Sequence, residues 1–415
     1  MDRRLPATPA GTRDLVVVGA GIIGLAVAWR ALEAGLSVTV LDPDPGDGST
    51  RAAAGMIAPA TEAEFTEDTA LHLHLTGASR WLSFAADLEA ASGLGVGLRE
   101  SGTLTLAYDG TDAALLRRIL ALHTRHAVTS ERLAISEARR REPLLGQRLT
   151  EAAWVPGDHA VDPRATHTAL WRAVDAHPHG AVVPRAVVRL DVDAGRVVGA
   201  VDETRHLHRA GATVVAAGWA SASLLADLPG VAVPVRPVKG QTLRLQADPE
   251  LAPRHVVRGL VQGRPVYVVS RAPATEGPWK GHCELVIGAT TEENPDDRRA
   301  TAGGVFALLR DARVLLPAID EATLVEATPR ARPSTPDNVP LLGPTHVPGL
   351  HLATGHHRNG ILLAPLTADV VVAGLTGSWF DVDVPSADPA AMLAALRATD
   401  PRRFSPTDPT TEGAP

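Results

Sequence analysis

The chain has 415 residues, which exceeds the usual size of one domain and predicts two. Its 45% apolar and 21% charged residues are typical of a globular protein, and its net charge of -7 argues against nucleic-acid and anionic-membrane partners. Glycine, proline or charged residues interrupt the apolar runs, so no membrane span is expected. The single cysteine, Cys283, allows neither an internal disulfide nor a metal cluster. We therefore expect a cytoplasmic protein without a bound metal.

The first elements predict a strand, a helix and a second strand. Residues 15–18 form a continuous apolar run, typical of a strand buried on both faces. A helical stretch follows from Leu25 to Ala34, and a second strand, residues 37–41, ends at Asp42. The turn between the first strand and the helix is rich in glycine and consists of Gly19, Ala20, Gly21, Ile22, Ile23 and Gly24.

This glycine pattern predicts a dinucleotide site. Gly19 permits the tight turn, Gly21 lets backbone N–H groups approach a pyrophosphate, and Gly24 allows close packing of the helix on the strand. The helix N-terminus adds partial positive charge, and Asp42 is placed to accept hydrogen bonds from a ribose. A glycine-rich turn without a ligand is the alternative, and the pattern does not separate FAD from NAD.

A run of small residues, 49–59, directly follows the second strand. Small side chains let the backbone pass close to a large flat ligand, and hydroxyl groups can reach its diphosphate. The run favours FAD, because an NAD enzyme has no need of such a segment there. A loose, alanine-rich loop is the alternative reading.

The rest of the chain contributes strands to two different sheets. A polar helical region spans about residues 112–141, and residues 182–183 and 187–188 are strand-like. Residues 213–219 predict another apolar strand with a glycine near its end, typical of a late strand of a doubly wound sheet. Residues 266–269 and 285–287 predict a second, more antiparallel sheet. Near the end, residues 351–355 resemble a strand entering a turn, and a helix is expected from about Leu363. The chain is therefore expected to cross between two domains several times.

Five segments together carry a resemblance to a known family: 49–59, 237–240, 288–290, 332–337 and 355–365. Because of these segments, the chain from residue 14 to about residue 375 resembles the glycine oxidases of thiamine biosynthesis, which belong to the D-amino-acid oxidase family of flavoproteins.

The resemblance implies an α/β fold. A doubly wound, Rossmann-like FAD-binding domain would be interleaved with an α+β substrate domain that is built on a mostly antiparallel sheet. The expected FAD-binding domain comprises residues 12–79, 150–228 and 328–376, and the expected substrate domain comprises residues 80–149 and 229–327. Residues 1–11 and 400–415 are expected to be flexible tails.

The resemblance also implies which residues hold FAD. The glycine-rich turn and Asp42 would bind the ADP half, with Val187 near the adenine and Gly218 packed beside the cofactor. The residues lining the diphosphate and isoalloxazine would be Thr50, Ala53, Ala54, Gly55 and Met56. The turn against the flavin pyrimidine edge would be Arg358, Asn359, Gly360, Ile361 and Leu362, and a helix N-terminus with Pro365 in its first turn would stabilise negative charge there. Cys283 lies away from these segments, so the FAD is expected to be non-covalent.

Three side chains are implied in substrate binding. Arg332 would grip a carboxylate through two hydrogen bonds, Tyr267 would donate its hydroxyl to that carboxylate, and Arg358 would help to position the substrate. Taken from the residues alone, the arginines could be surface charges and Tyr267 a half-buried core residue. Thr291, Pro265 and the run 328–331 depart from the family pattern, which puts the substrate in doubt more than the reaction.

The implied reaction is hydride transfer from the Cα of glycine to the flavin, with no catalytic side chain required beyond FAD. Oxygen would be reduced to hydrogen peroxide, and the glycine imine would give glyoxylate and ammonia or supply thiamine thiazole synthesis. The alternatives are an oxidase or dehydrogenase of sarcosine or a small D-amino acid, and a non-catalytic flavin-binding partner or sensor. A homotetramer is an expectation by resemblance alone.

Overall fold

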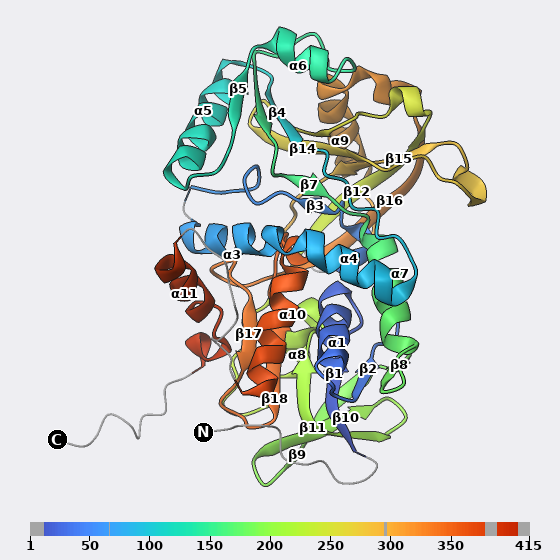
Figure 1. The fold of residues 1–415 in the computed structure, drawn as a ribbon, viewed down its shortest axis with the longest axis vertical. Coiled ribbons are helices and arrows are strands. Elements are labelled where there is room, and N and C mark those ends of the chain that lie inside the picture. Colours follow the sequence, from blue (N-terminus) through green and yellow to red (C-terminus); the bar gives the residue numbers. More distant parts are fainter. Residues whose placement is uncertain (1–11, 66, 294–296, 378–387, 406–415) are drawn as a thin grey trace, which may run out of the picture. The chain divides into compact units, whose positions relative to one another are not determined.

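The computed structural model describes residues 12–65, 67–293, 297–377 and 388–405 (Figure 1). The described chain divides into two compact units. The first unit holds the residues up to Ser49, His167–Pro237 and those from Arg332 onward, and the second holds Thr50–Thr166 and Val238–Ala331.

The first unit is built on a mostly parallel sheet. Its strand order is β17-β18-β11-β1-β2-β8, with β17 antiparallel to β18 and a β9–β10 hairpin continuing from β11. The strands are β1 (Arg13–Val18), β2 (Val38–Leu41), β8 (Gly180–Val183), β9 (Val187–Asp193), β10 (Arg196–Asp202), β11 (Leu207–Val215), β17 (Leu341–Pro344) and β18 (Leu350–Thr354). Residues 15–18 of β1 are buried, as the continuous apolar run predicts for a central parallel strand.

Two apolar helices lie side by side in this unit, α1 (Ile22–Glu33) and α10 (Gly360–Thr376) (Figure 1). Most of their residues are buried, because alanine and glycine let each helix approach its neighbours closely. The short α8 (Ser221–Leu224) and the terminal α11 (Pro389–Arg397) complete the unit.

The second unit contains an eight-stranded sheet of order β16-β12-β15-β14-β13-β4-β6-β5. Only β13 and β4 pair in parallel among the registers described, so the prediction of a mostly antiparallel second sheet is confirmed. Its strands are β4 (Thr103–Ala107), β5 (Glu131–Leu133), β6 (Glu151–Val155), β12 (Arg236–Ala247), β13 (Val256–Val261), β14 (Arg264–Ser270), β15 (Cys283–Gly288) and β16 (Thr323–Ser334). A separate small sheet pairs β3 (Met56–Ile57) with β7 (His159–Ala160).

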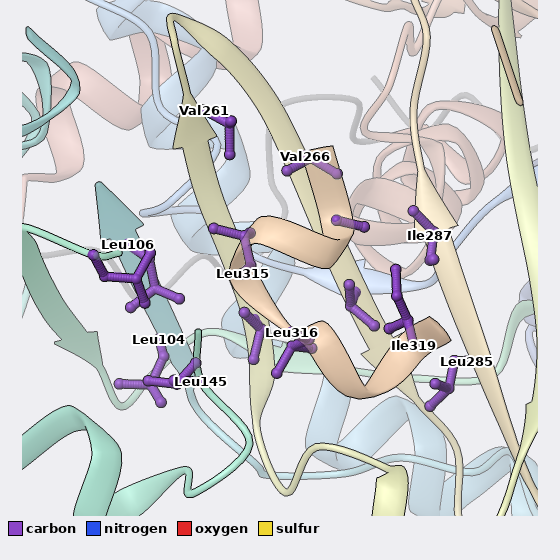
Figure 2. Close-up of a cluster of buried hydrophobic side chains, with 14 of the residues drawn as sticks. Leu104, Leu106, Leu145, Val261, Val266, Leu285, Ile287, Leu315, Leu316 and Ile319 are labelled. Atoms are coloured by element: carbon purple, nitrogen blue, oxygen red, sulfur yellow. The ribbon is translucent and has the colours of Figure 1, made fainter. Parts of the chain in front are cut away.

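Leucine, isoleucine and valine side chains form the core of the second unit (Figure 2). Leu104 and Leu106 of β4 and Leu285 and Ile287 of β15 point toward Leu315 of α9 (Ala302–Leu315) and its neighbours. The other helices that lie in this unit are α3 (Asp68–Ser79), α4 (Trp81–Ser92), α5 (Gly110–Arg125) and α6 (Ile135–Arg141).

The chain passes between the units inside regular elements. These crossings fall in α2 (Ser49–Ala52), α7 (Pro163–Asp175), β12 and β16. The unit boundaries differ from the expected domain boundaries, because residues 50–79 and 150–166 pack with the second unit. Strand β6 (Glu151–Val155) pairs with β4 and β5 of the second sheet, and side chains of that unit donate hydrogen bonds to the carbonyls of residues 51–54. The local sequence pattern does not reveal these long-range contacts.

Several expectations at the end of the chain need correction. Helix α10 begins at Gly360 and not at about Leu363, so Pro365 lies inside the helix and not in its first turn. Residues 401–404 form a short 3-10 helix, in which Arg403 pairs with Asp337, so the ordered chain extends into the range predicted to be a tail. The predicted tail residues 1–11 and 406–415 lie outside the described residues. Among those described, no helix is long and apolar enough to span a membrane.

Candidate functional site

The glycine-rich turn joins β1 to α1 at the carboxyl end of the parallel sheet. Gly19 has a φ of +108°, and a Cβ atom there would lie 2.5 Å from the carbonyl oxygen of Ala216. A Cβ atom at Gly24 would lie 1.8 Å from the carbonyl oxygen of Gly19. Both positions therefore exclude a side chain, as the dinucleotide pattern requires.

The N-terminus of α1 lies at the glycine turn. The helix starts at Ile22 directly after Gly21, which has no side chain that could cap it, and no acidic residue stands in its first turn. A helix N-terminus carries partial positive charge on its first N–H groups. The turn Gly19–Gly24 is thus built to receive a phosphate.

Two side chains of the first unit fix the path of this turn. Asp42, directly after β2, accepts hydrogen bonds from the backbone N–H of Ala20 at 2.7 Å and of Asp44 at 2.9 Å. His167 of α7 donates from Nε2 to the carbonyl oxygen of Ala20 at 2.8 Å. Burial lowers the pKa of His167, so its ring is neutral at pH 7. Each carboxylate oxygen of Asp42 can accept a further hydrogen bond, which leaves capacity for a ribose hydroxyl.

Other predicted cofactor residues lie at the same edge of the sheet. Gly218 follows β11, has a φ of +58°, and its carbonyl accepts a hydrogen bond from Thr354 at 2.8 Å. Val187 at the start of β9 packs against the apolar cluster that includes Val18 and Leu41. Ligands of open parallel sheets bind outside the carboxyl ends of the strands, so this placement agrees with the predicted ADP site.

The structure brings the segments of Arg332 and Arg358 together within the first unit. Ser334 of β16 forms an isolated bridge with His356, and its hydroxyl hydrogen-bonds His357 Nδ1. The backbone N–H of His357 also donates to the carbonyl oxygen of Pro333 at 2.8 Å. The end of β16 and the turn after β18 are thereby held side by side.

Positive charge is concentrated around His357. Burial, and after it the guanidinium groups of Arg358, Arg332 and Arg236, together lower its pKa to about 3. The family resemblance points to Arg332 and Arg358 but not to Arg236. Arg236 stands at the start of β12, and only the pairing of β12 with β16 connects it with Arg332. Three guanidinium groups in one region favour an anionic ligand such as a carboxylate.

The turn that follows β18 leads directly into α10. Asn359 precedes the first helical residue, Gly360, and Ile361 and Leu362 are buried. The helix has no acidic residue in its first turn, and the side chain of Asn359 does not cap it. The buried His356 forms a hydrogen bond between its Nε2 and the hydroxyl of Thr367 at 2.9 Å, which anchors the turn on the helix.

The second unit gathers the remaining predicted residues. Tyr267 and Met56 pack against an apolar cluster that contains Ala54, and Thr50 is buried. Gly55 has a φ of +81°, and a Cβ atom there would lie 1.9 Å from the carbonyl oxygen of Val161. The small-residue run is therefore a tightly packed segment and not a loose loop.

The predicted substrate tyrosine lies over a glycine of the neighbouring strand. Tyr267 pairs with Gly288, and a Cβ atom at Gly288 would lie 2.2 Å from the tyrosine hydroxyl. The residues that depart from the family pattern differ in burial, since Pro265 and Thr291 are exposed whereas Thr328 is buried. Arg332 and Arg358 belong to the first unit and Tyr267 to the second.

A buried lysine that sequence reasoning passed over orders the loop after β15. Lys239 is almost fully buried and pairs with Asp297 and Glu292. Gln241 joins the same network by donating to Glu292 at 2.6 Å and to Thr301 at 2.9 Å. These contacts give the segment 237–240 a structural role.

The described residues fit FAD and give no sign of a metal centre. The two glycines that exclude side chains, the start of α1 without an acidic residue in its first turn and the spare acceptor capacity of Asp42 together suit an ADP group. Within the described ranges, no three His, Cys, Asp or Glu side chains are arranged to hold a metal ion.

Comparison with known proteins assigns the chain to a family. Residues 14–373 match the family model of FAD-dependent oxidoreductases (DAO). The glycine oxidase of Geobacillus kaustophilus is 32% identical over 86% of this chain and 91% of its own. A crystal structure of glycine oxidase from that organism has a TM-score of 0.78 and 30% identity, covering 92% of this chain and 98% of the other.

A longer relative matches over part of its length. The bifunctional protein ThiO/ThiG of a Nostoc species is 34% identical over 87% of this chain. The match covers 52% of that relative, so the chain spans about half the length of the bifunctional protein. Because the family model matches most of the sequence and the glycine turn fits its cofactor, this chain belongs to the family of FAD-dependent oxidoreductases.

Proposed function

We propose that this FAD-dependent oxidoreductase oxidises glycine to glycine imine, which water converts to glyoxylate and ammonia, while oxygen is reduced to hydrogen peroxide. The similarity to glycine oxidases over most of the chain supports glycine as the substrate. The similarity to ThiO/ThiG supports a role of the product in thiamine biosynthesis.

The observation that carries the proposal is the concentration of guanidinium groups around His357. A carboxylate is the part that all amino acids share, and Arg332 is the group best suited to bind it through two hydrogen bonds. The same positive charges that lower the pKa of His357 would also lower the pKa of an amino group bound nearby. The neutral amine, which is the form that can be oxidised, is thereby favoured without a dedicated general base.

The chain's own residues would bind and orient the reactants. Arg332 and Arg358 would hold the substrate carboxylate, and Tyr267 would donate its hydroxyl to it. His357, kept neutral and hydrogen-bonded to Ser334, would fix the turn that carries Arg358. Bound FAD supplies the two-electron oxidation.

The residues proposed to hold FAD come from both units. Those in the first unit are Gly19, Ala20, Gly21, Ile22, Ile23, Gly24, Asp42, Val187, Gly218, Arg358, Asn359, Gly360, Ile361 and Leu362. Those in the second unit are Thr50, Ala53, Ala54, Gly55 and Met56. Accordingly, the first unit is proposed as the main FAD-binding domain and the second as the substrate domain. The proposal also includes non-covalent FAD. The single cysteine supports a cytoplasmic location, and the family resemblance supports a homotetramer.

Substitution of Arg332 tests the carboxylate role. Arg332→Met removes a charged hydrogen-bonding group, so we expect the KM for glycine to rise by about 10- to 100-fold. Arg332→Lys should restore part of that loss, because it keeps the charge but not the planar fork. The assay measures hydrogen peroxide and glyoxylate from glycine, sarcosine and D-alanine.

Arg330→Met is the matched control, because Arg330 lies in the same strand and donates to the carbonyl oxygen of Pro329. Its KM for glycine should stay near that of the unmodified enzyme. Equal KM values for the Arg330 and Arg332 variants would contradict the assignment. Peroxide from sarcosine or D-alanine but not from glycine would keep the oxidase and replace the substrate.

A further inference from the structure

In the second unit, side chains donate hydrogen bonds to four successive backbone carbonyls, those of residues 51–54. They stand at the C-terminal end of α2, where a helix leaves carbonyl groups without intrahelical partners. Arg244 Nη2 lies 3.2 Å from the carbonyl oxygen of residue 51 and 3.4 Å from that of residue 53. Thr242 Oγ1 donates to the carbonyl of residue 52 at 2.9 Å, and Arg271 Nη2 donates to that of residue 54. Each of the four carbonyls thus receives a side-chain donor.

These donors are buried deeply. Arg244 is 1% exposed, Arg271 is 8% exposed and Thr242 is 3% exposed. Arginine is almost never buried unless it is paired, and each of these is matched to a carboxylate, Arg244 to Glu284 and Arg271 to Asp162 at 3.9 Å.

The carboxylates and carbonyls do not engage every N–H group of the two buried arginines, Arg244 and Arg271. Within the described residues, Nε and Nη1 of Arg271 and Nε of Arg244 have no hydrogen-bond partner. Burying a guanidinium with unused N–H groups costs stability, and apolar side chains of similar volume are often as stable or more stable at such sites. Packing alone therefore does not explain why two arginines occupy these positions.

Further contacts fix the segment just beyond residue 54. The N–H of Val161 donates to the carbonyl oxygen of Gly55 at 2.8 Å. A Cβ atom at Gly55 would collide with Val161 and Pro163. Asp158 then accepts from the backbone N–H groups of residues 60 and 61 at 3.2 and 2.7 Å. Contacts within the second unit thus hold the backbone at residues 51–55 and again at residues 60 and 61.

We infer that Arg244, Arg271 and Thr242 are positioning residues for FAD, which act by orienting the backbone of the segment 50–56. They would not touch the cofactor. Their hydrogen bonds direct the carbonyls of this segment toward β12 and the end of β14, and so would set the orientation of the backbone that faces the cofactor. The inference rests on the family's FAD binding and on the lining role proposed for residues 50–56. It does not depend on which amine is oxidised.

The test measures FAD binding by the full-length apoprotein without any substrate. The dissociation constant is obtained from the quenching of FAD fluorescence, and visible circular dichroism of the bound flavin reports its surroundings. Thr242→Val and Arg271→Met should weaken FAD binding by about tenfold and change the dichroism spectrum, because each removes one buried hydrogen bond to the segment. Arg271→Lys should restore part of the affinity.

Arg139→Met is the matched control. Arg139 also donates to two successive carbonyls of the second unit, those of Gly146 and Gln147, both at 2.9 Å. Its replacement can lower the melting temperature of the apoprotein, but FAD affinity and the flavin spectrum should stay as in the unmodified protein.

Thr242→Val keeps the side-chain volume, so it carries the test even if the arginine variants do not fold. The inference is overturned if Thr242→Val binds FAD as tightly as the unmodified protein with the same spectrum, or if a folded Arg271→Met variant does. A loss of affinity in Arg139→Met equal to that in Thr242→Val would also overturn it, because the effect would then be general destabilisation. Failure of glycine to act as a substrate leaves each of these measurements unchanged.

Discussion

His356 illustrates how a single buried side chain links the proposed flavin turn to pH. Its burial lowers its pKa from 6.5 to about 3, and its Nε2 lies 2.9 Å from the hydroxyl of Thr367. Between pH 6.5 and about 3 the unfolded chain binds a proton that the folded chain does not. The free energy of unfolding therefore falls as the pH is lowered through this window and is not affected by this group above it.

The expected contribution of His356 is about 1.4 kcal/mol per pH unit below pH 6.5. His356→Gln should flatten the dependence of the unfolding free energy on pH by about this amount, although the variant itself will be less stable at pH 7. Urea unfolding of the apoprotein at pH 6.5 and at pH 5.0 measures the slope. His282→Gln, at a side chain that is 41% exposed, is the control. If both variants keep the slope of the unmodified protein, His356 does not have the proposed ionisation behaviour.

The sequence identifies individual site residues only where they belong to a recognisable motif. Arg332 and Arg358 were named by family resemblance, and the structure places their segments side by side. Arg236 and His167 were missed, because nothing in the local pattern shows that β12 adjoins β16 or that α7 reaches Ala20. Long-range pairing supplies that information, and one sequence does not contain it in readable form.

At the scale of elements, the β1–α1 junction is the part most strictly determined by sequence. Gly24 sits where α1 meets β1, and a methyl group there would overlap the carbonyl oxygen of Gly19 at 1.8 Å. The whole turn would have to move, which would displace the first N–H groups of the helix. The junction thus joins a packing requirement to the phosphate site.

Gly24→Ala should abolish or greatly weaken FAD binding and lower the melting temperature. The matched control is Gly303→Ala in α9, where a Cβ atom would meet nothing within 4 Å. Because alanine is the better helix former by about 1 kcal/mol, the control should be neutral or slightly stabilising. FAD fluorescence quenching and thermal melting compare the two. Unimpaired FAD binding by Gly24→Ala would contradict the described geometry of the turn.

The glycine turn and several strands are predicted by signals that are local. Two expectations are wrong in their extent: the strand expected over 213–219 ends at Val215 and a 3-10 helix covers Gly218–Ala220, and the helical region expected over about 112–141 is interrupted by β5. A continuous apolar run identified β1, and short apolar runs identified β14 and β15. The sequence predicts a start of helix α10 at about Leu363 with Pro365 in its first turn, whereas the helix begins at Gly360. Most residues of α10, Pro365 among them, are buried, so the packing of the helix offsets the cost of an internal proline, which is a tertiary effect.

At the scale of the whole molecule, the connectivity is the feature that sequence indicated without locating. The spacing of sheet-forming segments predicted a chain that crosses between two domains, and the structure has four crossings. Each crossing falls inside α2, α7, β12 or β16, so no change in composition marks it. The two compact units accordingly divide the chain at other positions than the expected domain boundaries near residues 79 and 149.

We propose that this FAD-dependent oxidoreductase takes two electrons from glycine. The absorbance of the bound oxidised flavin, recorded after glycine is added in the absence of oxygen, tests this proposal. Glycine should bleach this absorbance faster than sarcosine or D-alanine does, and air should restore it with release of hydrogen peroxide. If the flavin stays oxidised with glycine, although another amine or a chemical reductant reduces it, glycine is not the substrate.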